Sequence, residues 1–247
     1  MKNIFKIVIA IFLTVVTINA KEIVVGSDAE YPPFEYIDEN GKIAGFDIDL
    51  IGEISKIAGF EYKFIKVGFD ALIPALKAGK IDAIAAAMSA TPERKKSVDF
   101  SDPYFFTKNL YLKLATNNSI TNKEQLSKLK IGVMLGTVQE GVAHAIKGAK
   151  VIPTEGIAGS IMNLKAGKVD VVIVDSSVGF GYLKKNSDII SFLEEADGSD
   201  GFAFAFDKGK DSEFLAKFNA ALKEVKENGT YDKLLIKYDL KWIKFTH

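Results

Sequence analysis

The single arginine of the chain, Arg94, is the most distinctive candidate for binding chemistry. The sequence contains 32 lysines and arginines together, and all the others are lysines. Lysine therefore supplies the ordinary surface charge, whereas a lone guanidinium suits a place that needs planar, two-pronged hydrogen bonding to a carboxylate. A surface arginine without a role is the alternative interpretation, and composition alone favours neither.

Other candidates follow predicted strands, and open α/β sheets bind their ligands beyond the carboxyl ends of their strands. A guanidinium and the free amides of helix N-termini suit an α-carboxylate, while a carboxylate side chain suits an α-ammonium. The pattern therefore complements a free α-amino acid. Besides Arg94, the candidates at strand ends are Asp28, Phe69, Ser89, Thr91, Thr137, Gln139 and Asp175.

Several of these residues also have ordinary structural explanations. Asp28 suits a turn or a helix N-cap, and Thr91 and Thr137 suit N-caps, which does not exclude contact with a ligand. Phe69 suits a hydrophobic core. Asp175 is harder to explain structurally, because it ends the apolar run 171–174 and would be poorly solvated there.

Composition excludes several classes of function. The 247 residues carry 32 basic and 32 acidic side chains, so no basic excess is present to neutralise the phosphates of a nucleic acid. The absence of cysteine excludes disulfides, thiol nucleophiles, thiolate metal sites and a lipid-modified N-terminus. Histidine occurs only at His144 and His247, which argues against a catalytic triad or a histidine-rich metal site. We expect no cofactor and no metal.

Residues 1–20 are typical of a secretory signal peptide. Lys2 and Lys6 precede the mostly apolar run 7–18, and Ala20 precedes a change to polar sequence. The run is shorter than the roughly 20 residues that span a bilayer. We therefore expect cleavage near Ala20 and export to the periplasm as a protein without a lipid anchor.

A short internal repeat indicates two related lobes. LKAGKID at 76–82 recurs as LKAGKVD at 164–170, and in both places a helical pattern, a glycine C-cap and an apolar strand follow one another. Alternation of strands and helices continues around both copies, which predicts an α/β fold with mostly parallel sheets covered by helices. Capping boxes are predicted at Thr121–Glu124 and Thr137–Glu140.

The same pattern predicts how the chain divides. Apolar segments at 110–115 and 202–206 are predicted as two hinge strands that connect the lobes. Residues 21–109 and 207–247 are assigned to lobe 1, and residues 110–206, with the hinge strands, to lobe 2. The last two predicted helices, at 213–227 and 231–238, return to lobe 1.

A series of motifs along nearly the whole mature chain resembles the periplasmic solute-binding proteins of polar amino-acid ABC importers. That family has a two-lobed, hinged periplasmic-binding-protein fold, often called a Venus flytrap. The resemblance implies that the protein captures a free amino acid and delivers it to the membrane permease subunits of an ABC importer. The motifs are GSD at 26–28, YPPF at 31–34, GFDIDL at 45–50, FDALIPAL at 69–76, MSATPERKK at 88–96, DFSDPY at 99–104, GTVQE at 136–140 and NGTYDK at 228–233.

The resemblance also implies roles for individual residues. Arg94, Ser89 and the amides near Thr137 would hold the ligand carboxylate, and Asp175 the α-ammonium. Tyr31 and Phe69 would enclose the ligand side chain, and Asp28 would reach its polar end. Many relatives carry Ser or Gly where Ala86 and Ala87 stand, so Ala87 is expected to contribute through its backbone, and Val138 replaces a frequent Thr.

The class of ligand follows from a charge count. Arg94 and Asp175 balance the two charges common to all amino acids, which leaves Asp28 for a cationic side chain. We therefore expect arginine, lysine, ornithine or histidine, and we expect a monomeric binding protein without enzymatic activity. A neutral polar ligand such as glutamine or cystine is the first alternative. A cyclohexadienyl dehydratase-type enzyme is the second, with Glu30 or Glu140 as acid or base but without an evident partner.

Overall fold

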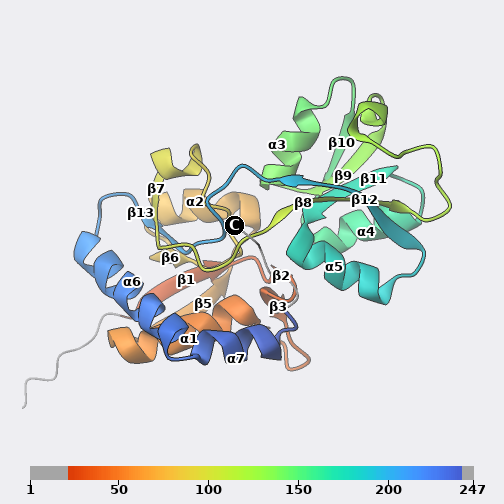
Figure 1. Ribbon diagram of the computed structural model, residues 1–247. Coiled ribbons are helices and arrows are strands. Elements are labelled where there is room, and N and C mark those ends of the chain that lie inside the picture. The colour runs from red at the N-terminus through yellow and green to blue at the C-terminus, as the bar shows by residue number, and fades with distance from the viewer. Residues whose placement is uncertain (1–21, 241–247) are drawn as a thin grey trace, which may run out of the picture.

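Two five-stranded sheets organise the chain, and each forms the centre of one lobe (Figure 1). The computed structural model describes residues 22–240. The predicted α/β, two-lobed fold is confirmed. The predicted signal peptide lies outside the described residues. Between residues 22 and 240, no helix has the length and apolar character needed to cross a membrane.

The sheet of lobe 1 has the strand order β5-β1-β6-β13-β7. Strands β5 and β6 both run parallel to β1, while β13 pairs antiparallel with β6 and β7. The strands are β1 (Ile23–Ser27), β5 (Tyr62–Lys66), β6 (Ala83–Ile84), β7 (Val98–Phe100) and β13 (Ala205–Asp207). The helices of this lobe are α1 (Phe46–Ala58), α2 (Phe69–Lys77), α6 (Ser212–Glu227) and α7 (Thr230–Lys237).

The sheet of lobe 2 has the order β10-β9-β11-β8-β12, with β8 antiparallel to both of its neighbours. Its strands are β8 (Lys108–Leu114), β9 (Lys130–Met134), β10 (Lys150–Thr154), β11 (Val171–Asp175) and β12 (Ile189–Ala196). Its helices are α3 (Val138–Ala145), α4 (Ile157–Lys165) and α5 (Ser176–Lys185). A separate three-stranded sheet consists of β2 (Glu30–Tyr31), β3 (Glu35–Ile37) and β4 (Ile43–Ala44).

The sequence repeat occupies the same position in both lobes. In lobe 1 it joins α2 to β6, and in lobe 2 it joins α4 to β11. Each copy ends in an aspartate that accepts a hydrogen bond from the backbone N–H at the first parallel strand: Asp82 from Val24 (3.0 Å) and Asp170 from Lys130 (2.8 Å). The carboxylate fastens the end of the repeat to the sheet, so the repeat marks a shared structural unit.

The chain crosses twice between the lobes, before β8 and after β12. Phe105 and Phe202, one on each crossing, form an antiparallel bridge. Most of the predicted hinge strand at 110–115 is β8, which continues as an inner strand of lobe 2 and is buried along most of its length. The predicted hinge strand at 202–206 includes Phe202 and the start of β13.

One predicted helix is wrong. Residues 121–129 contain only a 3-10 turn, Lys123–Leu126, and its capping box uses Asn122 and Gln125 instead of Thr121 and Glu124. A shift of one residue suffices because Asn is as good an N-cap as Thr and Gln can replace Glu. Strands β2, β3, β4, β7 and β12 were not predicted, because their short or half-exposed sequences lack a clear apolar pattern.

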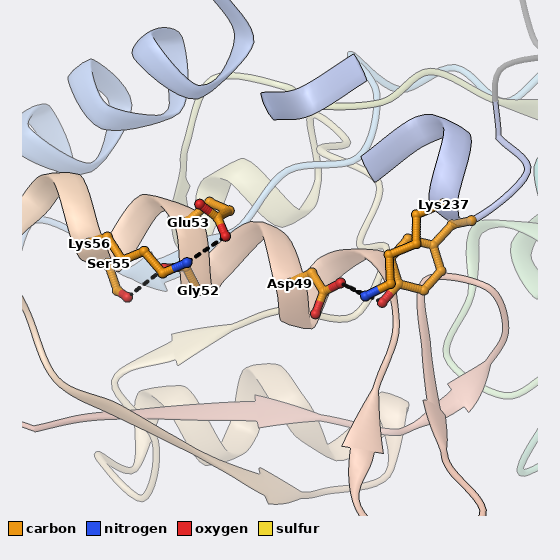
Figure 2. Close-up of polar contacts among 7 residues, drawn as sticks. Asp49, Gly52, Glu53, Ser55, Lys56 and Lys237 are labelled. Carbon is orange, nitrogen blue, oxygen red and sulfur yellow. Dashed lines mark hydrogen bonds and ion pairs between the residues drawn. The ribbon is translucent and has the colours of Figure 1, made fainter. Parts of the chain in front are cut away.

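The last two helices, α6 and α7, both pack on α1 of lobe 1. Helix α1 faces the core through Leu50, Ile51, Ile54 and Ala58 and ends at Gly59, whose φ of 67° is easy only for glycine. Figure 2 shows its exposed side, where Lys237 of α7 pairs with Asp49 at 2.5 Å and Lys56 pairs with Glu53 at 2.6 Å. The pair between Lys237 and Asp49 ties the end of α7 to α1.

Candidate functional site

A cavity of about 250 Å³, including its opening, lies between the lobes. Eight of the ten predicted site residues line it, and Asp28 and Thr91 do not. The lining also includes Ala86, Met134 and Val138, whose apolar side chains carried no chemical signal in the sequence. From lobe 1 the lining residues are Tyr31, Phe69, Ala86, Ala87, Ser89 and Arg94; from lobe 2 they are Met134, Thr137, Val138, Gln139 and Asp175.

Arg94 is held rigidly at the junction of the lobes. Its Nη1 donates to the carbonyl oxygen of Ser89 (2.9 Å) and its Nη2 to that of Gly136 in lobe 2 (3.0 Å). Its guanidinium carbon lies 5.3 Å from the ring centroid of Phe69. Burial lowers the pKa of Arg94 to about 10, against the opposing charges of Asp175 and Asp197, so the side chain remains cationic at neutral pH.

Thr91 supports this arginine from outside the cavity. Arg94 begins the 3-10 turn Arg94–Lys96, and the hydroxyl of Thr91 accepts a hydrogen bond from the backbone N–H of Arg94 (3.2 Å). The N-cap of the turn is Glu93 rather than the predicted Thr91, although the Thr91 hydroxyl still binds the first N–H of the turn. The turn directs the guanidinium of Arg94 into the cavity between the lobes.

Ser89 and Thr137 place hydroxyl groups on either side of the cavity. The hydroxyl of Ser89 donates to Asp197 Oδ2 at 3.3 Å. Thr137 is the N-cap of α3, where it accepts from the N–H of Glu140 (3.4 Å), as the predicted capping box requires. The carboxylate of Glu140, however, accepts from Gly136 rather than from Thr137. The first turn of α3 thus faces the cavity with the partial positive charge of a helix N-terminus.

Asp175 is a buried carboxylate with one oxygen to spare. It ends β11, and its Oδ2 accepts a hydrogen bond from the hydroxyl of Tyr31 at 2.5 Å, which joins the two lobes. No group of the described chain hydrogen-bonds its Oδ1. Burial raises the pKa of Asp175 to about 7, while Tyr31 and Arg94 favour its ionised form. Nearby, Gln139 donates to Asn109 at 2.9 Å and is held in place.

Gly136 allows the lobes to approach closely. Its φ is 78°, in the left-handed region that favours glycine, and a Cβ atom built on it would lie 2.9 Å from the Cα of Asp70 in lobe 1. Only a residue without a side chain permits this contact. The same glycine supplies the carbonyl that Arg94 binds.

Asp28 belongs to a group of three buried carboxyl side chains, with Glu35 and Asp47. Their exposed fractions are 1%, 0% and 0%. Burial is the main cause that raises the pKa of Asp28 and of Asp47 to about 7 and that of Glu35 well above its usual range. Of the three, only Asp28 was a predicted site residue. Asp47 stood in the sequence only within the GFDIDL motif, and Glu35 is a polar residue in the short strand β3 that carried no signal of its own.

This acidic group touches the cavity wall from behind. Glu35 of β3 is the cross-strand partner of Tyr31 in β2. Asp47 accepts hydrogen bonds from the N–H of Ala87 (2.8 Å) and from the hydroxyl of Tyr104 (2.6 Å). Ala87 has an unusual φ of 42°, so its bond to Asp47 stabilises a strained part of the wall. Ala87 thus lines the cavity with a backbone conformation that Asp47 supports.

The described residues, 22–240, contain no cluster of three or more histidine, cysteine, aspartate or glutamate side chains arranged to hold a metal ion. The exposed His144 lies 3.8 Å from Glu140 on the same helix, on the surface of lobe 2.

Comparison with known proteins places this geometry in context. The model of the family described as bacterial extracellular solute-binding proteins, family 3, matches residues 23–241. The chain is 47% identical over 216 residues to a probable histidine-binding protein of Campylobacter jejuni, covering 87% of this chain and 84% of the relative. It is 37% identical to the arginine-binding extracellular protein ArtP of Bacillus subtilis, covering 88% and 86%.

Solved structures agree with the sequence comparison. An ancestral arginine-binding protein bound to arginine superposes with a TM-score of 0.83 at 41% identity, covering 88% of this chain and 97% of that one. The periplasmic-binding-protein fold that the resemblance implied is therefore the fold of this chain.

Proposed function

Because the chain belongs to the bacterial extracellular solute-binding proteins, family 3, we propose that it captures a free cationic amino acid and delivers it to an ABC importer. Arginine, lysine, ornithine and histidine are the candidate ligands. Relatives named for binding histidine and arginine support this class. The observation that carries the proposal is the set of buried carboxyl groups next to the cavity. Among the described residues, no lysine or arginine is a main cause of the pKa shifts of Asp28 and Glu35, so these groups lack a cationic partner.

The two ends of the cavity suit the groups common to all amino acids. Arg94, the hydroxyl of Ser89 and the first turn of α3 would bind the α-carboxylate, since a guanidinium and a helix N-terminus both favour anions. Asp175 would bind the α-ammonium through the oxygen that is still open. Tyr31 and Phe69 would enclose the ligand side chain, and a ring face also favours a cation.

Specificity for a cationic side chain would come from Asp28 together with Glu35. All four of their carboxyl oxygens are buried, and within the described chain the two carboxyl groups have no side-chain partner except each other. A guanidinium, ammonium or imidazolium group would supply both the donors and the charge that these oxygens lack. An acidic side chain would be repelled, so aspartate and glutamate are not expected to bind.

The cellular role follows from the family and from the N-terminal sequence. Residues 1–20 would direct export and be cleaved, so the mature protein would act in the periplasm without a lipid anchor. Its partners would be the amino acid and the permease subunits of the importer, and we expect the protein to be a monomer. We also propose that it has no enzymatic activity, because the relatives that it resembles are named as binding proteins.

A thermal-shift panel of the twenty amino acids plus ornithine, followed by calorimetry of each hit, tests the proposed ligand class. Stabilisation by arginine, lysine, ornithine or histidine is expected, and stabilisation confined to glutamine or cystine would overturn the cationic assignment. Incubation with prephenate, followed by the absorbance of the aromatic product, tests the absence of dehydratase activity. Turnover there would contradict the role of a binding protein.

A further inference from the structure

The buried carboxyl groups lie one residue layer behind the cavity. Asp28 follows β1, Glu35 belongs to β3 and Asp47 lies in the first turn of α1. The charges of Asp47 and Asp28 are the next causes after burial that raise the pKa of Glu35, so the three groups act on one another. Tyr31, which pairs with Glu35, and Ala87, which binds Asp47, are both cavity-lining residues.

The groups that face the cluster are acids, phenols and amides. The hydroxyl of Tyr104 and the N–H of Ala87 donate hydrogen bonds to one oxygen of Asp47. The charge of Asp47 also helps to raise the pKa of Tyr231. Glu30 raises the pKa of Asp28, and Asp175 raises that of Glu35. Tyr31 completes the surroundings beside Glu35. Among the described residues, no lysine or arginine is a main cause of the pKa shifts of these three carboxyl groups.

Protons therefore replace the missing cations. Three ionised carboxylates in a dry, shared space repel one another and lose their hydration, so at least one group stays neutral. The contact between Glu35 and Asp28 raises the pKa of Glu35 and lowers that of Asp28, as two carboxyl groups that share a proton do. In the empty site this proton occupies the role that a ligand cation would otherwise fill.

Building on the proposed function, we propose that a cationic ligand exchanges with a proton held by Asp28, Glu35 and Asp47. As the ligand side chain enters, an O–H bond of one carboxyl group breaks and the proton passes to solvent. The carboxylate that remains pairs with the ligand cation. One positive charge enters and one leaves, so the net charge of the buried space does not change and the cost of an unpaired carboxylate is avoided.

The exchange makes affinity depend on pH in a defined direction. When binding releases protons, affinity rises with pH, by up to tenfold per pH unit for each proton released. The dependence ends when the cluster is already ionised in the free protein. Asp175 contributes a similar release when it receives the α-ammonium, because burial also raises its pKa to about 7. The experiment must therefore separate the cluster from Asp175.

Calorimetry with L-arginine at about pH 7, in buffers of different ionisation enthalpy, measures the number of protons released. Arginine is the right probe because its guanidinium stays protonated, so each released proton comes from the protein. Glu35→Gln removes one titrating group of the cluster and leaves Asp175 intact. Glu53→Gln is the matched control, the same change on the exposed side of α1, where Glu53 pairs with Lys56 (Figure 2).

The expected result is a release of roughly one proton or more by the wild type and by Glu53→Gln, and a smaller release by Glu35→Gln. Asp28→Asn provides a second variant of the cluster. The affinity of the wild type for arginine, measured at several pH values, is an independent test and should rise with pH. Arginine binding whose heat is independent of the buffer, or equal release by wild type and both cluster variants, would overturn the exchange. A protein that binds no cationic amino acid would overturn the proposed function as well, and the two failures differ because only the first shows binding.

Discussion

The two lobes share one scaffold but build different walls for the cavity. In each lobe the repeat leads from a helix through a glycine to a strand, β6 in lobe 1 and β11 in lobe 2. These strands run parallel to β1 and β9, and the aspartate of the repeat accepts a backbone hydrogen bond from β1 or β9. In lobe 2 the strand ends directly at Asp175. In lobe 1 the regular strand ends at Ile84, and an irregular segment that includes Ala87 forms the wall.

The polar groups behind these walls differ even more. In lobe 2 they are mostly paired, as Gln139 is with Asn109 and Asp175 is with Tyr31. In lobe 1, the buried carboxyl groups of Asp28 and Glu35 have no side-chain partner in the described chain except each other. Buried polar groups are normally satisfied, so unsatisfied ones mark a place where a ligand completes the structure. We infer that Asp175 of lobe 2 binds the α-ammonium that all amino acids share, whereas the buried carboxyl groups of lobe 1 read the side chain.

The largest effect is expected from Arg94, the lobe 1 residue that binds a group common to all ligands. Arg94→Ala would leave the ligand carboxylate unpaired, at a cost of about 3–5 kcal/mol, or about two to four decades in affinity. Arg94→Lys should also bind poorly, because an ammonium cannot replace the two-pronged guanidinium. Calorimetry with arginine and with lysine as ligands measures both. Lys95→Ala, on the same turn but at the surface, is the control, and near-native binding by Arg94→Ala would return Arg94 to the role of a surface charge.

The second prediction separates the two lobes directly. Asp175→Asn should weaken every amino acid ligand by about the same factor, roughly 10–100, because each ligand carries an α-ammonium. Asp28→Asn should weaken arginine and lysine by a similar factor but leave any neutral ligand unaffected. Competition assays with arginine and glutamine measure the ratio of affinities. Equal losses in both variants for all ligands would remove the distinction between the lobes.

The third prediction concerns the contact between the lobes. Gly136→Ala should weaken binding about tenfold, since its Cβ would collide with Asp70 and its φ of 78° disfavours alanine. A ligand bound by both lobes should reduce the radius of gyration of the wild type in X-ray scattering, and this reduction should shrink in the variant. Gly141→Ala in α3, where a Cβ meets no atom within 4 Å, is the matched control. Tight binding without any change in radius would contradict closure by the ligand.

The smallest effect is expected on stability without ligand. Unfolded Asp and Glu ionise near pH 4, whereas burial raises the pKa of Asp28 and Asp47 to about 7 and that of Glu35 well above its usual range. Between these values the folded state retains protons that the unfolded state has lost, so their contribution to stability falls as pH rises from about 4 to 7.

Glu35→Gln should therefore raise the melting temperature of the ligand-free protein by about 3–6 °C near pH 7.5, and by less near pH 4.5. Differential scanning calorimetry at both pH values checks this, with Glu53→Gln as the control. A lower melting temperature of Glu35→Gln at pH 7.5 would show that the Glu35 carboxyl group stabilises the free protein. That result would contradict the conclusion that the carboxyl groups of lobe 1 await a ligand.

Local sequence was sufficient to predict the scaffold and most of the cavity. The repeat predicted two related α/β units because a helix, a glycine C-cap and an apolar strand are each determined by neighbouring residues. Arg94, Asp175 and the Thr137 cap were predictable because chemically distinctive side chains stood at predicted strand ends or helix starts.

Tertiary structure alone decided how these parts meet. Helix 121–129 was overpredicted, and Ala86, Met134 and Val138 joined the cavity only through packing between the lobes. Glu35 lies beside Asp28 and Asp47 because the short pairing of β2 with β3 brings it there. The three residues belong to different elements, since Asp28 follows β1 and Asp47 lies in α1. Whether a carboxyl group is solvated or buried beside two others depends on the whole fold, and so does the pKa that follows from it.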